Sequence, residues 1–113
     1  MSLAIKRSDH FWADLLKQVD WYRDNANGEI AEKYVDAVEA TLQDLSRSPG
    51  LGRPRFKEWP ELAGLRSWRV QKPYHRHLIF YRFDGQNLMA ERVLHGARDL
   101  CRRLRQAPHE EET

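Results

Sequence analysis

Apolar residues recur at helical spacing in two neighbouring stretches of the N-terminal half. The first stretch places Phe11, Trp12, Leu15, Leu16, Val19 and Tyr22 on one arc, at about 100° per residue. Ser8 and Asp9 suit the start of this helix, because a side-chain oxygen can cap free amides and a carboxylate favours the positive helix end. A second helix is predicted to about Arg47. Its apolar side is formed by Ile30, Tyr34, Ala37, Val38, Thr41 and Leu45. The turn "DNANG" between the two helices predicts an antiparallel hairpin.

The remaining segments have the alternation that is typical of strands. "SLAIKR" can form a short first strand, and "LRSWRVQ" alternates from residue to residue. "HLIFYRF" is apolar on both faces, which predicts a central strand, and "DGQN" is a hairpin turn before "LMAERVLH". "ARDLCRRLRQ" predicts a short C-terminal helix. The order β-α-α-β-β-β-α predicts an α+β fold in which the helical hairpin packs on a mostly antiparallel four-stranded sheet.

Length and composition predict one compact domain over residues 1–107, followed by an acidic, disordered tail at 108–113. The long segment "SPGLGRPRFKEWPELAG" between helices and strands contains three Pro and three Gly and predicts a loop. Cys101 is the only cysteine, so no intrachain disulfide can form. The N-terminus has no export signal, and no apolar run is long enough for a membrane span. A cytoplasmic location and no membrane partner are therefore expected.

The net charge of +2 conceals an uneven distribution. Residues 1–50 hold six Lys or Arg and nine Asp or Glu, whereas residues 51–107 hold thirteen and five. Three glutamates follow in the tail. A positive half of this kind can attract phosphates or an acidic protein segment, although a solvated arginine-rich surface would give the same count.

Several segments, in this order and spacing, resemble the ParE/RelE superfamily of bacterial toxin–antitoxin toxins, also called plasmid stabilisation proteins. They are "LQDLSRSPGLGRPR", "LAGLRSWRV", "HLIFYRF" and "RVLHGARDL", and the last two are most similar to the ParE branch. The resemblance implies a toxin of a type II module that is neutralised by a cognate antitoxin. ParE-type members inhibit DNA gyrase by binding it. RelE-type members are ribosome-dependent mRNA endonucleases, and a solitary, non-toxic binding module of the same fold is a third possibility.

A ribonuclease would need an acid or base together with cations around the phosphate. The candidates are His95, Arg66, Arg82, Arg92 and Arg98. Unless a bulge intervenes, Arg92 and His95 point to opposite faces of their strand. No tyrosine follows Tyr81, so His95 would act alone, and a lone histidine at a strand end is more often structural. We therefore assign no catalytic residue and favour a protein that binds its target.

The binding hypothesis assigns basic and aromatic residues of the C-terminal half to the target. They are Arg69, Tyr81, Arg98, Arg102, Arg103 and Arg105. A solvated helix face is the alternative for the last three. In "LHGARDL", Gly96 permits a sharp exit from the last strand, and Asp99 suits the N-terminus of the next helix. This motif is predicted to close the fold beside the binding surface.

The two helices carry wider apolar arcs than the roughly 100° of an ordinary amphipathic face. The surplus predicts a groove for an antitoxin helix, although a small domain could use the same residues in its own core. The predicted antitoxin-binding residues are Trp12, Leu16, Trp21, Val35, Leu42 and Trp59. A homodimer or a toxin–antitoxin hetero-oligomer is also possible. "HRH" lacks a neighbouring acid or cysteine, so no metal site and no cofactor are predicted.

Overall fold

The computed structural model describes residues 2–96 and residue 104, which contain two helices and five strands. The strands are β1 (Ala4–Arg7), β2 (Arg53–Pro54), β3 (Arg66–Arg69), β4 (His77–Phe83) and β5 (Asn87–His95). The helices are α1 (Asp9–Asn25) and α2 (Gly28–Arg47). Two short 3-10 turns, Pro49–Leu51 and Pro60–Leu62, lie in the long loop. The predicted C-terminal helix and the acidic tail, with Arg98, Asp99, Cys101, Arg102, Arg103 and Arg105, lie outside the described residues.

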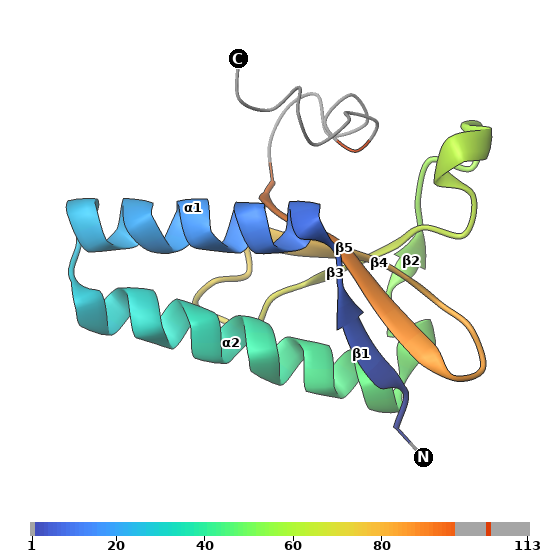
Figure 1. Cartoon of the computed structure of the whole chain (residues 1–113), viewed down its shortest axis with the longest axis horizontal. Coiled ribbons are helices and arrows are strands. Elements are labelled where there is room, and N and C mark those ends of the chain that lie inside the picture. Colours follow the sequence, from blue (N-terminus) through green and yellow to red (C-terminus); the bar gives the residue numbers. More distant parts are fainter. Residues whose placement is uncertain (1, 97–103, 105–113) are drawn as a thin grey trace.

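The predicted helix boundaries are confirmed, and local caps explain them. Ser8 Oγ accepts a hydrogen bond from the Phe11 amide at 3.0 Å and starts α1. Asn27 Oδ1 accepts one from the Ile30 amide at 2.9 Å and starts α2. Each side chain satisfies one of the amides that a helix leaves free at its start. Because only Ala26 and Asn27 separate the helices, they run antiparallel and side by side (Figure 1).

The sheet has the order β1-β5-β4-β3-β2, with β4 at its centre as predicted. The expectation of four strands is corrected to five, because Arg53–Pro54 of the long loop pairs with β3 as a short edge strand. β1 is parallel to β5, whereas all other neighbours are antiparallel. The register of β4 and β5 changes between Tyr81, opposite Ala90, and Phe80, opposite Arg92.

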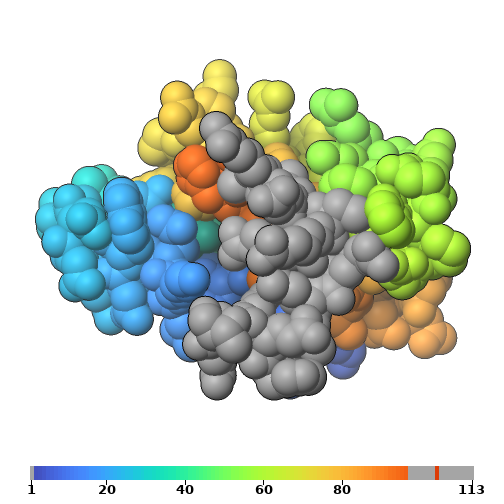
Figure 2. Space-filling model, turned by 90° about the horizontal axis from the view of Figure 1, so that it is seen from above, coloured from blue at the N-terminus to red at the C-terminus, as the bar shows by residue number. Residues whose placement is uncertain are grey.

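Apolar residues cover both faces of the sheet. On one face the two helices contribute to the main core, together with Ile79 and Tyr81 of β4 and Val93 of β5. On the other face Phe80 and Leu94 pack with Leu62 and Leu65 of the long loop, and Leu104 lies against them. The long loop therefore covers the sheet face that the helices leave open. Figure 2 shows this loop (green) at the end of the molecule far from the helix–helix turn.

Tyr81 fastens the start of the long loop to the sheet. Its hydroxyl accepts a hydrogen bond from the Gly52 amide at 2.8 Å and donates one to the Pro49 carbonyl at 2.7 Å. The side chain is fully buried. The prediction that Tyr81 binds a target is therefore wrong for this conformation, because a buried ring on the core side of β4 has no free face.

Within the residues that the structure describes, no helix is both long and apolar enough to cross a membrane.

Candidate functional site

The outer side of the helical hairpin carries an apolar surface that the core does not use. Trp12 is 44% exposed and Leu16 is 59% exposed. These two residues lie one turn apart on α1. Val19, which is 8% exposed and mostly buried in the main core, and Arg23 follow them at helical spacing. Burial of such side chains in water-excluding contacts stabilises a complex, so an exposed apolar stripe of this kind is a candidate interface.

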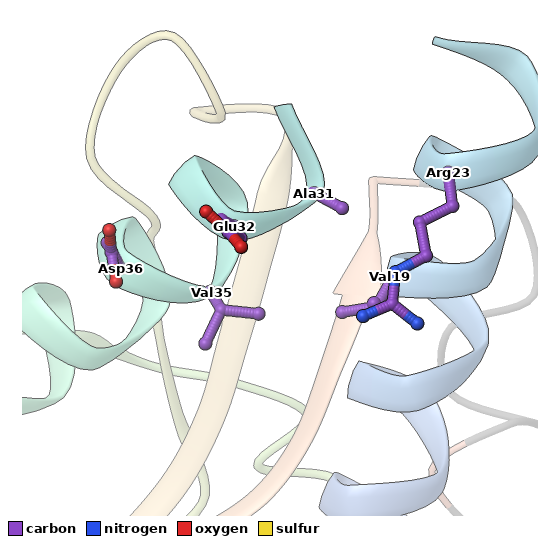
Figure 3. Close-up of a pocket in the computed structure, with 6 residues that line it drawn as sticks. All are labelled: Val19, Arg23, Ala31, Glu32, Val35 and Asp36. Atoms are coloured by element: carbon purple, nitrogen blue, oxygen red, sulfur yellow. The ribbon is translucent and has the colours of Figure 1, made fainter. Parts of the chain in front are cut away.

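A pocket of about 240 Å³ continues this stripe between the two helices. Figure 3 shows Val19 and Arg23 on α1 facing Ala31, Glu32, Val35 and Asp36 on α2, with the strands behind. The floor is apolar, while Arg23 lies on one side and the two acids on the other. We call Trp12, Leu16, Val19 and Val35 the hairpin groove. This groove has an apolar floor between two helices and charged residues at its sides, which suits the apolar face of a third helix.

Arg7 borders this groove on the side of β1. Its guanidinium lies over the Trp12 ring, 5.6 Å from the ring centre. The same guanidinium forms an ion pair with Glu39 of α2. A cation over an indole holds the ring in a defined orientation. Trp12 is thus exposed but held in place, which lowers the entropy cost of binding a partner.

The other four predicted antitoxin residues lie in four different places. Val35 lies in the hairpin groove, whereas Leu42 is fully buried in the main core, so its assignment to an interface is wrong in this conformation. Trp59 packs against the second cluster on the opposite sheet face and is not part of the groove. Trp21 is 56% exposed but lies about half a helical turn away from Trp12, beside His95.

A second concave surface lies at the edge of the sheet where β2 ends. Its volume is about 830 Å³, and it is lined by Leu51, Arg53, Arg55, Ser67, Trp68, Arg69, Val70, Gln71, Lys72, His75 and Leu78. We call it the basic groove, because the lining contains four cationic side chains and a histidine but no acid. Leu51 and Trp68 expose apolar surface within it. Of the two predicted target-binding residues in the described part, Arg69 and Tyr81, Arg69 has an exposed side chain.

The arginines proposed for nuclease chemistry are held by contacts within the protein. Arg92 is buried and donates two hydrogen bonds to Asp14 of α1, at 2.7 and 2.8 Å. Its assignment as a phosphate clamp is therefore wrong in this conformation. The register change in β5 lies before Arg92 and not between Arg92 and His95. The two side chains therefore point to opposite faces of the strand, as predicted.

Arg66 and Arg82 also bind backbone carbonyls. Arg66 donates to the Gly52 carbonyl at 2.6 Å and lies over the Phe83 ring. Arg82 donates to the carbonyls of Glu61 and Ala63, each at 3.0 Å, and forms an ion pair with Glu91 at 3.2 Å. These contacts fix the long loop to the sheet. Neither guanidinium lies near His95, at the other end of β5, so the nuclease set is not assembled among the described residues.

His95 is exposed and lies next to a buried histidine. Its ring centre is 5.1 Å from that of His77, which is directly opposite on β4. His77 forms a hydrogen bond of 3.0 Å with the Tyr22 hydroxyl. Burial lowers the pKa of His77 to about 4, and the neighbouring His95 acts in the same direction. Figure 2 shows the end of β5 (orange) between the loop at residues 71–76 (yellow) and α1 (blue).

Two features escaped prediction from the sequence. The Asp14–Arg92 pair joins residues 78 positions apart, and no local pattern indicates it. The basic groove combines the start of the long loop with β3 and the turn after it. The sequence held part of this signal, because basic residues lie close together in "GRPRF" and in "SWRVQK". Among the residues described, no group of His, Cys, Asp or Glu has an arrangement that could hold a metal ion.

Solved structures of toxin–antitoxin proteins share this architecture. The chain resembles the chromosomal ParDE system of P. aeruginosa with 21% identity, 85% of this chain and 98% of the other covered, and a TM-score of 0.69. It resembles the RelBE2 complex of Mycobacterium tuberculosis with 26% identity, 84% and 99% covered, and a TM-score of 0.57. The E. coli DinJ–YafQ complex is 14% identical, with 88% and 99% covered and a TM-score of 0.58.

The sequence itself also matches a family model. No curated protein matches the chain significantly. Residues 5–100, however, match the model described as the ParE toxin of the type II toxin–antitoxin system parDE. This range includes both helices, β2 to β5, all of β1 except Ala4, and the residues that line the pocket between the helices and the basic groove. The chain therefore belongs to the ParE toxin family, within the ParE/RelE superfamily of type II toxin–antitoxin toxins.

Proposed function

We propose that this toxin acts by binding and inhibiting DNA gyrase, and that a cognate antitoxin neutralises it. We favour a binding mechanism because of the contacts and positions of the candidate nuclease residues. Arg66, Arg82 and Arg92 are held by contacts with the protein itself, and His95 lies away from the first two. General acid–base catalysis at a phosphate needs these groups close together and free to meet it.

The hairpin groove is the proposed antitoxin site. Several similar structures are toxin–antitoxin systems or complexes, which supports an antitoxin partner for this chain. Trp12 and Leu16 would anchor an amphipathic helix, and the pocket lined by Val19 and Val35 would take one further apolar side chain. Arg23 on one side and Glu32 and Asp36 on the other would fix the direction of that helix.

A ribosome-dependent endonuclease is the second candidate, and the basic groove favours it. Arg53, Arg69 and Lys72 could contact RNA phosphates, and the exposed Trp68 ring could stack on a base. His75 is the one histidine that lines this groove. Cleavage would therefore depend on His75, on His95 at the end of β5, or on residues outside the described part.

Induction of the toxin in a bacterial host separates the two mechanisms. Inhibition of gyrase predicts loss of negative supercoiling in a reporter plasmid and a DNA-damage response before protein synthesis declines. An endonuclease predicts rapid arrest of translation with mRNA cut on ribosomes. Coexpression of the antitoxin is the control, since it should suppress either effect. Cut mRNA with normal supercoiling would reject the gyrase proposal.

A further inference from the structure

The basic groove has a free strand edge as well as its charge. β2 pairs with β3 only at Arg66 and Ser67. The Val70 amide donates to the His77 carbonyl at 3.0 Å, so alternate residues of β3 bond to β4. Arg69 lies between these positions, and its N–H and C=O therefore face the side on which β2 has ended. An exposed strand edge of this kind can accept an extended segment.

The charges around this edge specify an acidic occupant. Arg53, Arg69 and Lys72 are exposed, and Arg55 and His75 complete the basic lining. No acid lines the groove to neutralise them. A single exposed ion pair contributes little, so an occupant needs several carboxylates in succession. Leu51 and Trp68 provide apolar surface for the chain that carries those carboxylates.

The chain itself contains such a segment close to the groove. Glu110, Glu111 and Glu112 are three successive acids. Leu104 lies against the second apolar cluster, and Leu78 belongs to that cluster and also lines the basic groove. Glu110 follows Leu104 by six positions, and an extended chain of that length spans at most about 20 Å. The glutamates are therefore within reach of the groove while Leu104 keeps its contact.

We propose that the acidic segment Glu110–Glu112 occupies the basic groove of its own chain. The segment lies along the open edge at Arg69 and places its carboxylates beside Arg53, Arg69 and Lys72. Because the two parts are joined by a short linker, their effective concentration is on the order of millimolar even when each ion pair is weak. The contact competes with any other acidic ligand of the groove, so the tail screens this surface. The proposal concerns the basic groove alone and does not depend on the target of the toxin.

The test uses the full chain with the triple replacement Glu110→Gln, Glu111→Gln and Glu112→Gln. At low salt, the backbone amide NMR signals of Arg53, Trp68, Arg69 and Lys72 should shift relative to the unmodified protein. Adding about 0.5 M salt to the unmodified protein should reproduce these shifts, because salt screens exposed charges. A matched control removes three exposed acids of the hairpin, with Asp20→Asn, Asp24→Asn and Glu29→Gln. It should leave the four groove signals unchanged.

A hexaglutamate peptide added in trans gives a second readout. It should bind the tail variant at least about threefold more tightly than the unmodified protein, and Arg53→Glu with Arg69→Glu should abolish this binding. Equal peptide affinity for the two proteins, or tail-dependent shifts that spare the groove, would overturn the proposal. Shifts that vanish on dilution would also overturn it and assign the groove to the tail of a second copy. A single-stranded RNA that binds both proteins equally, while the peptide binds neither, would assign the groove to nucleic acid.

Discussion

The Arg92 guanidinium and the Asp14 carboxylate form a buried, doubly hydrogen-bonded pair that joins β5 to α1. Asp14 also accepts a hydrogen bond from the Val93 amide at 3.2 Å. One helix is thus fixed to the strand that leads to His95. Arg92 belongs to the segment "RVLHGARDL", which resembles the toxin family, and the pair with Asp14 gives this arginine a structural role.

Removal of Asp14 should strongly destabilise the protein. Asp14→Ala leaves the Arg92 guanidinium buried without its carboxylate, and we expect a loss of about 3–5 kcal/mol in the free energy of unfolding. Urea denaturation measures it. Glu29→Gln breaks the exposed Glu29–Lys33 pair and is the control, with an expected change below about 0.5 kcal/mol. Similar values for the two variants would show that the buried pair does not support the fold.

The close approach of the long loop to β4 depends on a glycine. A Cβ added at Gly52 would lie 2.5 Å from the Tyr81 hydroxyl and 2.8 Å from the Ser67 carbonyl oxygen. Gly52→Ala should therefore cost about 1–3 kcal/mol through displacement of the loop. Gly50→Ala is the matched control, because a Cβ there meets no atom within 4 Å. A melting temperature that falls equally in both variants would refute this explanation.

His77 should make the stability depend on pH. Its pKa is about 4 in the folded protein, against an ordinary value of 6.5, so the unfolded chain binds the proton first as pH falls. The contribution of neutral His77 to the free energy of unfolding is fully present above about pH 6.5. It decreases as pH falls toward 4, by up to about 3 kcal/mol. Urea denaturation at intervals between pH 7 and 4 measures the slope. His77→Phe should flatten this part of the profile, and an unchanged slope would contradict the assignment to His77.

The hairpin groove should tolerate a charge in the free toxin but not in the complex. Leu16 is 59% exposed, so Leu16→Glu should change the free energy of unfolding by less than about 0.5 kcal/mol. Antitoxin affinity should fall at least about 30-fold, because the carboxylate would be buried at the interface. Calorimetry measures both. Gln18→Glu adds the same charge at a partly exposed position on the opposite side of α1 and should leave affinity within about threefold. Equal losses in the two variants would exclude the groove.

Periodic features of the fold could be predicted from the sequence, and contacts between distant segments could not. Apolar spacing and caps gave both helices, and the doubly apolar "HLIFYRF" gave the central strand. β2 escaped prediction because its two residues carry no alternation and contain a proline. Leu42 and Tyr81 were predicted to bind partners, but both are buried. A sequence pattern shows which side of a helix or strand is apolar, and it does not show how far neighbouring elements cover that side. Arg92 looked like a phosphate ligand because Asp14 is remote in sequence.

The central claim is that the toxin acts by binding its target without cleaving RNA. Purified toxin added to purified DNA gyrase, relaxed plasmid and ATP tests it most directly. Inhibition of supercoiling that rises with toxin concentration, survives His95→Ala and is reversed by the antitoxin is the predicted result. Full gyrase activity at every toxin concentration, together with cleavage of ribosome-bound mRNA that disappears in His95→Ala, would contradict it.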